Sequence, residues 1–288
     1  MTQDKGTVVI SGASTGIGAA CAEHLSQRGF TVLAGVRSEA DHRRISALNN
    51  PHLRPLFLDV TSEESIAEAV EIVSETTGEA GLSALVNNAG IVAAGPIEYV
   101  SIDEVRGLFE VNVLGLMATV KAFIPLLRQA QGRVVNIGSI SGRSAMPFMS
   151  PYASSKFAVE AISDSLRVEL RPWNIEVCLL EPGSVSTPLF DKYLASLDAY
   201  IEGLPPKAKE LYGRCLAGVR TVAVENATKG HTPESIARTV ERALTATSPK
   251  ARYLCGEGPR QMLVLESLPS SMRDWVIDKA LRHKGKPT

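Results

Sequence analysis

Short apolar runs alternate along this chain with longer amphipathic stretches. The runs are rich in valine, isoleucine and leucine, have the length of strands, and occupy residues 7–11, 31–36, 53–60, 82–88, 132–139 and 175–182. The clearest helical stretches between them are 15–28, 62–77 and 101–129. Near-continuous apolar strands that alternate with helices are typical of parallel sheets covered on both faces. The pattern therefore predicts a doubly wound, Rossmann-like α/β fold.

The alternation stops between residues 188 and 231. No linker or internal repeat divides the chain, so we expect one domain over residues 1–288 with an insertion at 189–230. Long insertions are functional lids or disordered loops, and regular leucines, alanines and tyrosines favour an ordered, helical, apolar lid. The same side chains also suit an ordinary helix packed on the core; they are Phe190, Tyr193, Leu194, Leu197, Tyr200 and Leu204. A helix from Thr232, a last strand at 251–256 and an amphipathic segment around Trp275 should follow.

Composition excludes several classes of protein. The net charge is −1 and the pI is near 6.5, which argues against a nucleic-acid surface. The cysteines and histidines lack metal-ligand spacing, so we expect no metal site. The N-terminus enters a strand at once without signal-peptide regions. We expect no membrane span, because no apolar segment approaches the length of one. These features predict a cytoplasmic protein.

A glycine-rich turn follows the first strand. In "SGASTGIGAA" the glycines Gly12, Gly16 and Gly18 are spaced GxxxGxG and a helix begins after them. Glycines there permit a tight turn and let backbone amides approach a pyrophosphate at the helix N-terminus. The spacing differs from the GxxxxGK[ST] loop of nucleotide hydrolases and from GxGxxG. The alternative is a turn that binds nothing, but its place after the first strand favours a dinucleotide site.

The end of the second strand indicates which dinucleotide is bound. An acidic residue there holds the ribose hydroxyls of NAD, whereas an arginine accommodates the additional phosphate of NADP. This chain has Val36, which accepts no hydrogen bond from a ribose, followed by Arg37, whose guanidinium suits phosphate. Ser14 in the glycine turn offers a further hydroxyl. We therefore expect NADP (NADPH), with NAD as the alternative if Arg37 is merely solvated.

A tyrosine and a lysine stand four positions apart in "SPYASSKFAVE". On a helix Tyr152 and Lys156 share one face. A cation beside a phenol lowers the phenol's pKa, which makes it a usable acid or base near neutral pH. Taken alone, the pair also fits a surface tyrosine beside a solvated lysine.

Together the motifs resemble the short-chain dehydrogenase/reductase family. They are "SGASTGIG", "NNAG" at 87–90, "VNVLG" at 111–115, Ser139 thirteen positions before Tyr152, "YASSK" and "EPGSVSTP", in family order over roughly residues 5–188. "GFTVLAGVR", "GRVVNIGSISGR" and "YASSKFAVEAISDSLRVEL" resemble the steroid and retinol dehydrogenase branch. Two departures, Ser11 for the usual threonine and Gly138 where serine is common, remove no catalytic group.

The resemblance implies a role for each matching residue. Tyr152 is the general acid/base that protonates a carbonyl oxygen, and Lys156 lowers the pKa of Tyr152 and binds the nicotinamide ribose. Ser139 orients the substrate carbonyl, and Asn112 supports a water in a proton relay. Hydride transfer builds negative charge on oxygen, so donors must already be in place. The resemblance also implies that Tyr152 and Lys156 contact the cofactor. The other implied cofactor-binding residues are Gly12, Ser14, Thr15, Gly16, Ile17, Gly18, Arg37, Asp59, Val60, Asn87, Asn88, Ala89, Gly90, Pro182, Gly183, Val185 and Thr187.

Plainer structural roles remain open for three of these residues. Asn112 inside an apolar helix suits bonding to the backbone, Ser139 suits a strand-end cap, and Asp59 suits a cap of the next helix. The combined motifs favour catalysis over all three.

The expected reaction interconverts an alcohol with a ketone or aldehyde on a largely apolar substrate, which is steroid-, retinoid- or long-chain-like. Met146, Phe148 and Met149 offer the wall opposite the lid. The alternatives are an NAD-dependent dehydrogenase of the same fold and a non-catalytic dinucleotide sensor. The resemblance also implies a homo-dimer or tetramer built on the helix that carries Tyr152 and on residues 101–129.

Overall fold

A seven-stranded parallel sheet forms the centre of the protein in the computed structural model, which describes residues 5–256 and 258–284. The strand order is β3-β2-β1-β4-β5-β6-β7. Because the order reverses between β1 and β4, a crevice opens there at the carboxyl edge of the sheet. The strands are β1 (Thr7–Ile10), β2 (Thr31–Val36), β3 (Leu53–Phe57), β4 (Ala84–Asn87), β5 (Arg133–Ile137), β6 (Glu176–Pro182) and β7 (Arg252–Cys255).

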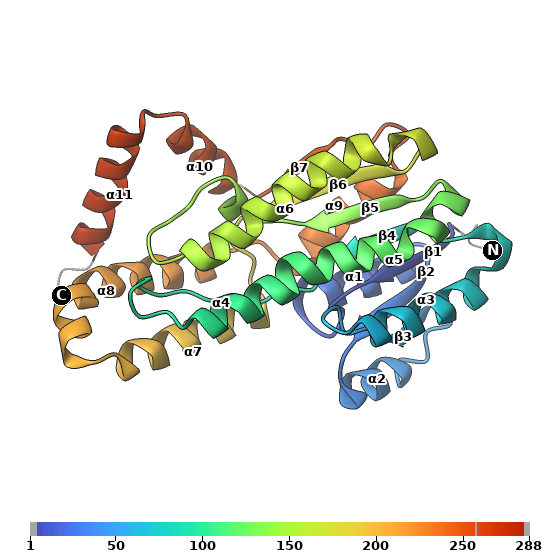
Figure 1. The fold of residues 1–288 in the computed structure, drawn as a ribbon, viewed down its shortest axis with the longest axis horizontal. Helices are drawn as coiled ribbons and strands as arrows, with labels where there is room; N and C mark the ends of the chain where they lie inside the picture. The colour runs from blue at the N-terminus through green and yellow to red at the C-terminus, as the bar shows by residue number, and fades with distance from the viewer. Residues whose placement is uncertain (1–4, 257, 285–288) are drawn as a thin grey trace.

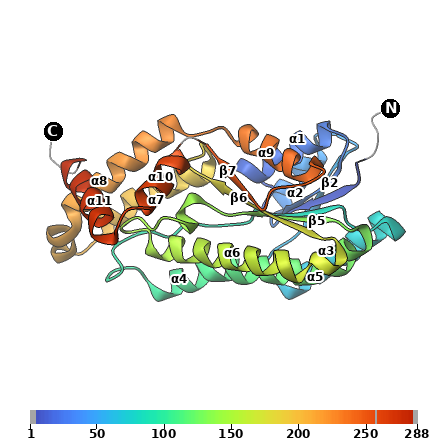
Figure 2. The same ribbon diagram turned by 90° about the horizontal axis from the view of Figure 1, so that it is seen from above.

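Two layers of helices cover the sheet (Figure 2). One layer contains α1 (Gly16–Gln27), α2 (Glu39–Ser46) and α9 (Pro233–Thr245). The other contains α3 (Glu63–Thr77), α4 (Ile102–Phe109), α5 (Gly115–Ala130) and α6 (Ser150–Glu169). The predicted doubly wound α/β fold is confirmed.

The strands pack on both layers because successive side chains point to opposite faces. In β1 the side chains of Val8 and Ile10 join the core against α1 and α9, whereas Val9 joins the core against α3 and α5. All three are fully buried. Burial on both faces explains why the strands read as continuous apolar runs and do not alternate with polar residues.

Four further helices gather at one end of the molecule (Figure 1). They are α7 (Pro188–Gly203), α8 (Pro206–Lys229), α10 (Gly258–Glu266) and α11 (Ser270–Lys284). Helix α8 packs against α7 and α11, and Leu204, Ala208 and Leu216 are buried in a small apolar cluster of their own. The predicted insertion at 189–230 is therefore ordered and helical.

The apolar stretch predicted as one helix at 101–129 is interrupted. A π-helical segment, Glu110–Leu114, separates α4 from α5. The stretch Ile102–Ala130 also corrects our expectation about membrane spans. It is 29 residues long and contains an 18-residue window with a mean hydropathy of 1.5, so it is long and apolar enough to cross a bilayer. In this fold 44% of that window is buried, and α5 packs against α3 and β4. The apolar side chains of this stretch thus pack in the protein core.

Candidate active site

The glycine turn after β1 is held against the end of β4. Gly12 and Gly16 have φ values of +64° and +59°, which favour glycine. A Cβ on Gly12 would lie 2.8 Å from the Cα of Ala89, so the two backbones approach closely there. The hydroxyl of Ser11 accepts hydrogen bonds from the backbone N–H groups of Asn88 and Ala89, both at 3.1 Å. The predicted "SGASTGIG" and "NNAG" motifs therefore form one unit.

The N-terminus of α1 opens toward this turn. Its N-cap residue Thr15 makes no side-chain capping hydrogen bond, which leaves the first backbone N–H groups of the helix for another acceptor. Gly18 supports this geometry from behind, because a Cβ there would lie 2.3 Å from the carbonyl oxygen of Gly12. Gly18 therefore lets the helix pack on its own turn and does not line the cavity.

One cavity of about 620 Å³ extends from the glycine turn to the carboxyl ends of β4, β5 and β6. It brings together most of the residues that the sequence singled out. The lining includes Gly12, Ser14, Thr15, Gly16, Ile17, Arg37, Val60, Asn88, Ala89, Gly90, Ser139, Tyr152, Lys156, Pro182, Gly183, Val185 and Thr187. The lining does not include Gly18, Asp59, Asn87 or Asn112.

Two of these absent residues have structural partners, and their contact with cofactor stays a prediction. The side chain of Asn87 is buried and donates to Oδ1 of Asn136 at 2.9 Å, and Asn136 in turn donates to Ser163 on α6 at 2.9 Å. The carboxylate of Asp59 accepts from the N–H and the hydroxyl of Thr61 at 3.0 and 2.7 Å. Both side chains face their own neighbours because backbone turns and buried amides need partners.

Ser139, Tyr152 and Lys156 meet at the floor of the cavity. Ser139 follows β5 and accepts from the N–H of Ser141 at 3.1 Å, which fixes its hydroxyl at the start of a short 3₁₀ turn. Tyr152 and Lys156 share one face of α6, with the lysine Nζ 5.8 Å from the tyrosine ring centroid. Nζ also donates to the carbonyl oxygen of Ile137 at 2.9 Å. One sheet edge and one helix therefore place the hydroxyl, the phenol and the ammonium together.

Burial dominates the proton affinities of this pair. It raises the pKa of Tyr152 above its ordinary value, and a hydrogen bond with Ser139 lowers it by less. Burial lowers the pKa of Lys156 to about 8. The lowering of this pKa by Lys156 stays a prediction, because burial and the hydrogen bond with Ser139 are the causes that set the direction in this structure. A raised pKa keeps the phenol protonated at neutral pH, which is the form that donates.

Asn112 organises the wall from the π-helical segment. Its Oδ1 accepts from the N–H of Ile91 at 2.8 Å, and its Nδ2 donates to the carbonyl of Ile91 at 2.9 Å and to Ser155 at 3.1 Å. A Cβ on Gly90 would lie 3.4 Å from Asn112 Oδ1 and 3.9 Å from Lys156 Nζ. Glycine at 90 therefore keeps open the space between Asn112 and Lys156, where the predicted relay would run.

A second arginine lies at the adenosine end of the site. Arg44 from α2 donates through Nη2 to the carbonyl oxygen of Ser14 at 2.5 Å and to Asp41 at 3.0 Å. Arg37 lines the cavity nearby, and Val36 is 1% exposed in the core. Sequence reasoning missed Arg44, although a basic residue in the helix directly after Arg37 was a signal that could have found it.

The far wall of the cavity is largely apolar and comes partly from the predicted lid at 189–230 and partly from elements that the sequence did not connect with the site. Helices α8, α10 and α11 contribute, and the segment before Tyr152 contributes as predicted through two of its three residues. The wall is made of Val219, Val222, Ala223, Gly258, Pro259, Gln261, Met262, Leu281, Met146 and Met149. Sequence reasoning missed the part of this wall from α10 and α11, because distant apolar positions carry no local signal for a shared pocket.

The expected contribution of α7 is corrected. Leu197 and Tyr200 line a separate cavity of about 300 Å³, and Leu204 is buried in the apolar cluster of the lid, against which Phe148 packs. Leu194 is half-buried and is not part of the main wall. The side chains of Phe190 and Tyr193 lie outside the described part of the structure. Helix α7 therefore packs on α8 and faces the loop after β4 and α4, and its described side chains do not line the main cavity.

A family model for short chain dehydrogenases matches residues 6–197. The chain belongs to this family. It is 37% identical over 258 residues to the mitochondrial D-beta-hydroxybutyrate dehydrogenase of Rattus norvegicus, covering 85% of this chain and 75% of the relative. It is 35% identical to 17-beta-hydroxysteroid dehydrogenase type 6 of Bos taurus, covering 96% and 89%. A short-chain dehydrogenase structure from Streptomyces avermitilis superposes with a TM-score of 0.77 at 25% identity, covering 97% and 98%.

The site of this short-chain dehydrogenase fits a nicotinamide dinucleotide. The close approach at Gly12, the uncapped start of α1 and the position of the cavity at the strand-order reversal are the features that such a cofactor requires. The protein is an NAD(P)-dependent oxidoreductase that interconverts an alcohol and a carbonyl compound.

Proposed function

We propose that this dehydrogenase uses NADPH to reduce the carbonyl group of a largely apolar, steroid-, retinoid- or long-chain-like substrate. The observation that carries the proposal is the apolar wall from α8, α10 and α11, which faces Ser139 and Tyr152 across one cavity. Sites of this composition gain most of their binding energy from apolar contact and use few polar groups for orientation.

The charges around the cavity favour this class over short hydroxy acids. In the described part of the chain its lining contains two cationic side chains, Arg37 and Lys156. Arg37 lies at the adenosine end, and Lys156 is engaged with the carbonyl of Ile137. A small carboxylate substrate therefore lacks a free cation on the apolar wall to balance its charge.

The preference for NADPH rests on Arg37 and Arg44. Both guanidinium groups lie at the adenosine end, and Arg44 already contacts the backbone of Ser14. Arginine binds phosphate with charge-assisted hydrogen bonds. Val36 is apolar and buried, so it gives no acceptor for the ribose hydroxyls of NAD.

The cofactor supplies the hydride that adds to the carbonyl carbon. The side chains of this protein then stabilise and protonate the oxygen on which negative charge builds. The hydroxyl of Ser139 donates to that oxygen, and the phenol of Tyr152 transfers its proton to it. Lys156 stands beside the resulting phenolate, where its own lowered pKa eases passage of the next proton.

The test measures the loss of NADPH absorbance when the protein is mixed with a panel of apolar ketones and aldehydes or with a matched panel of short keto acids. We expect turnover of the apolar panel in wild type, little of the keto acids, and none in Tyr152→Phe, with NADPH binding retained. Turnover confined to keto acids would refute the substrate class. NADPH binding without any turnover would favour the non-catalytic sensor.

We also propose a cytoplasmic homo-oligomer. Exposed apolar side chains of the π-helical segment, α5 and α6 support the contact between copies; they are Leu114, Met117, Phe157 and Val168. Light scattering tests the assembly, and replacing Phe157 and Met117 with lysine should produce monomers. Fractionation of cells that produce the protein tests its location.

A further inference from the structure

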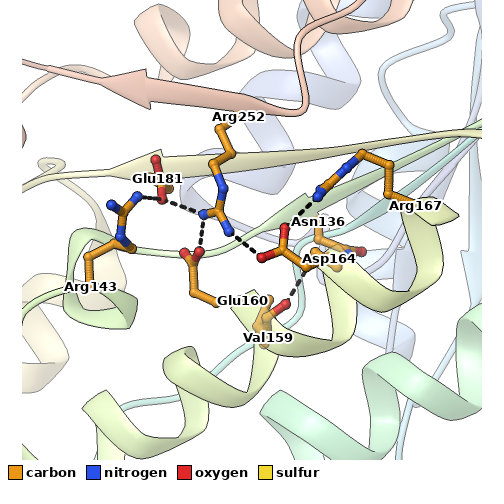
Figure 3. A network of polar contacts seen from close by, with 9 residues as sticks. Asn136, Arg143, Val159, Glu160, Asp164, Arg167, Glu181 and Arg252 are labelled. Carbon is orange, nitrogen blue, oxygen red and sulfur yellow. Dashed lines mark hydrogen bonds and ion pairs between the residues drawn. The ribbon is translucent and has the colours of Figure 1, made fainter.

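A cluster of ion pairs connects β6, β7 and α6 (Figure 3). Arg252, the first residue of β7, places its guanidinium among three carboxylates. Its Nη1 contacts Glu160 and lies 2.9 Å from Glu181, and its Nη2 lies 2.7 Å from Asp164. One side chain thus joins β7, β6 and the helix α6.

Each partner belongs to an element that carries part of the site. Glu160 lies four residues after Lys156 on α6, so both share one face of the helix. Glu181 in β6 directly precedes the segment that lines the cavity, and it also accepts from Arg143 at 3.0 Å. Arg143 caps the short turn that begins at Ser139. The cluster therefore connects three parts of the site. They are the turn that begins at Ser139, called the serine turn below, helix α6 with Tyr152, and the cavity-lining residues at 182–187, called the cofactor segment below.

The two carboxylates nearest the site are deeply buried. Glu160 is 7% exposed and Glu181 is 2% exposed. One oxygen of Glu160, Oε1, is buried without a hydrogen-bond partner in the described part of the chain. A Cβ on Gly142 would lie 2.9 Å from the Cγ of Glu160, so the serine turn packs directly on this side chain. Burial raises the pKa of Glu160 to about 6, against the opposing effect of Arg252.

We propose that Arg252 is a positioning residue for the reaction, holding Ser139, Tyr152 and the cofactor segment in their working arrangement through Glu160 and Glu181. The inference rests on the carbonyl reduction proposed above. A buried charge that loses its partner cannot stay in place without cost, so the elements separate when the guanidinium is removed. Small displacements of reacting groups lower the rate far more than they lower cofactor binding.

The hydrogen bond between Ser139 and Tyr152 reports on this arrangement. It lowers the pKa of Tyr152 against the larger effect of burial. If α6 shifts relative to the serine turn, this bond weakens and the pKa of Tyr152 rises further. A change in that pKa distinguishes positioning from a purely structural contribution, and it can be measured without any substrate.

The test uses the double variant Glu160→Gln/Arg252→Met. It removes one buried negative charge and one positive charge. Asp164 still accepts a hydrogen bond from Arg167 at 2.8 Å, and Glu181 still accepts one from Arg143. No carboxylate is left unpaired by the change. The control is Arg167→Gln, which removes a contact to Asp164 and leaves the contacts of Arg252 intact.

We expect the double variant to lose about tenfold to hundredfold in kcat, with a dissociation constant for NADPH close to that of wild type. The pKa of Tyr152, taken from ultraviolet titration difference spectra against Tyr152→Phe, should rise in the double variant and stay unchanged in Arg167→Gln.

Wild-type kcat and an unchanged Tyr152 pKa in the folded double variant would overturn the inference, as would equal effects in Arg167→Gln. If the double variant does not fold, Arg252→Lys is measured in the same way. This variant keeps the positive charge but loses the guanidinium that contacts three carboxylates. If wild type reduces no carbonyl compound, the proposed function fails, but the tyrosine titration still decides whether Arg252 positions the site.

Discussion

Replacing Arg44 with glutamine tests how the protein selects its cofactor. In the structure the guanidinium spans from Asp41 to the carbonyl oxygen of Ser14, at 3.0 and 2.5 Å. It therefore lies at the glycine turn beside the position expected for the additional phosphate of NADP. The substitution removes the charge and keeps a side chain of moderate length.

The expected magnitude follows from the kind of contact that is lost. A hydrogen bond to a charged group contributes about 1.5–3 kcal/mol, and about 1.4 kcal/mol corresponds to a tenfold change in affinity. The side chain of Arg44 is 51% exposed, so solvent and salt reduce the effect to the lower part of this range. We expect NADPH to bind about tenfold more weakly, NADH to bind as before, and the melting temperature to change little.

Fluorescence titration with NADPH and NADH measures both affinities. Arg43→Gln is the matched control, because it removes the same charge from the same helix, and the described contacts place no hydrogen bond between its side chain and the glycine turn. Arg37→Gln should resemble Arg44→Gln and the double variant should lose the preference for NADPH. An equal loss for NADH, or an equal loss in Arg43→Gln, would refute the reasoning. Arg37 and Arg44 also make a cleaner test than Val36→Asp, which would place a carboxylate in the core.

Three further predictions concern the framework of the site. Gly18→Ala should abolish cofactor binding and lower the melting temperature, because the added Cβ would lie 2.3 Å from a backbone carbonyl oxygen. The control is Gly107→Ala in α4, whose added Cβ has no atom within 4 Å and which should be neutral. Burial raises the pKa of Cys21 to about 12, so alkylation followed by mass spectrometry should label the partly buried Cys215 first; early labelling of Cys21 in native protein would contradict this. The folded-state pKa of Glu160, about 6 against an ordinary 4.5, means that its protonation stabilises the fold below pH 4.5 and that this contribution is lost as the pH rises through 6. Denaturation of Glu160→Gln should show a weaker loss of stability over that interval, and an unchanged pH profile would argue against the raised pKa.

The sequence was sufficient where a local pattern has one structural solution. The apolar runs that became β1, β2, β4, β5 and β6 are buried on both faces, which a parallel sheet between two helix layers requires. Gly12 and Gly16 occupy backbone conformations with positive φ, so their identity predicted a turn. The separation of four residues between Tyr152 and Lys156 placed both on one face of α6.

Local pattern was insufficient where a side chain had more than one possible partner. Asn87 stands in a motif beside the cofactor, yet its amide turns to Asn136 in the neighbouring strand. The sequence also left two arrangements open for α7, because an amphipathic helix can pack its apolar face on other elements or on the cavity. The sequence also does not give the balance between desolvation and the Ser139 hydrogen bond that sets the direction of the pKa of Tyr152, since burial is a property of the folded chain.

The sequence by itself therefore determined the fold, because periodicity, glycine conformation and helical spacing act over a few residues. Its resemblance to the short-chain dehydrogenases implied the class of reaction and the catalytic groups. Only the tertiary structure decided the apolar wall and the cluster around Arg252. Their members come from α8, α10 and α11, and from α6, β6 and β7, respectively. These contacts join residues that are distant in sequence, and they arise only when the sheet brings its helices and loops to the same edge.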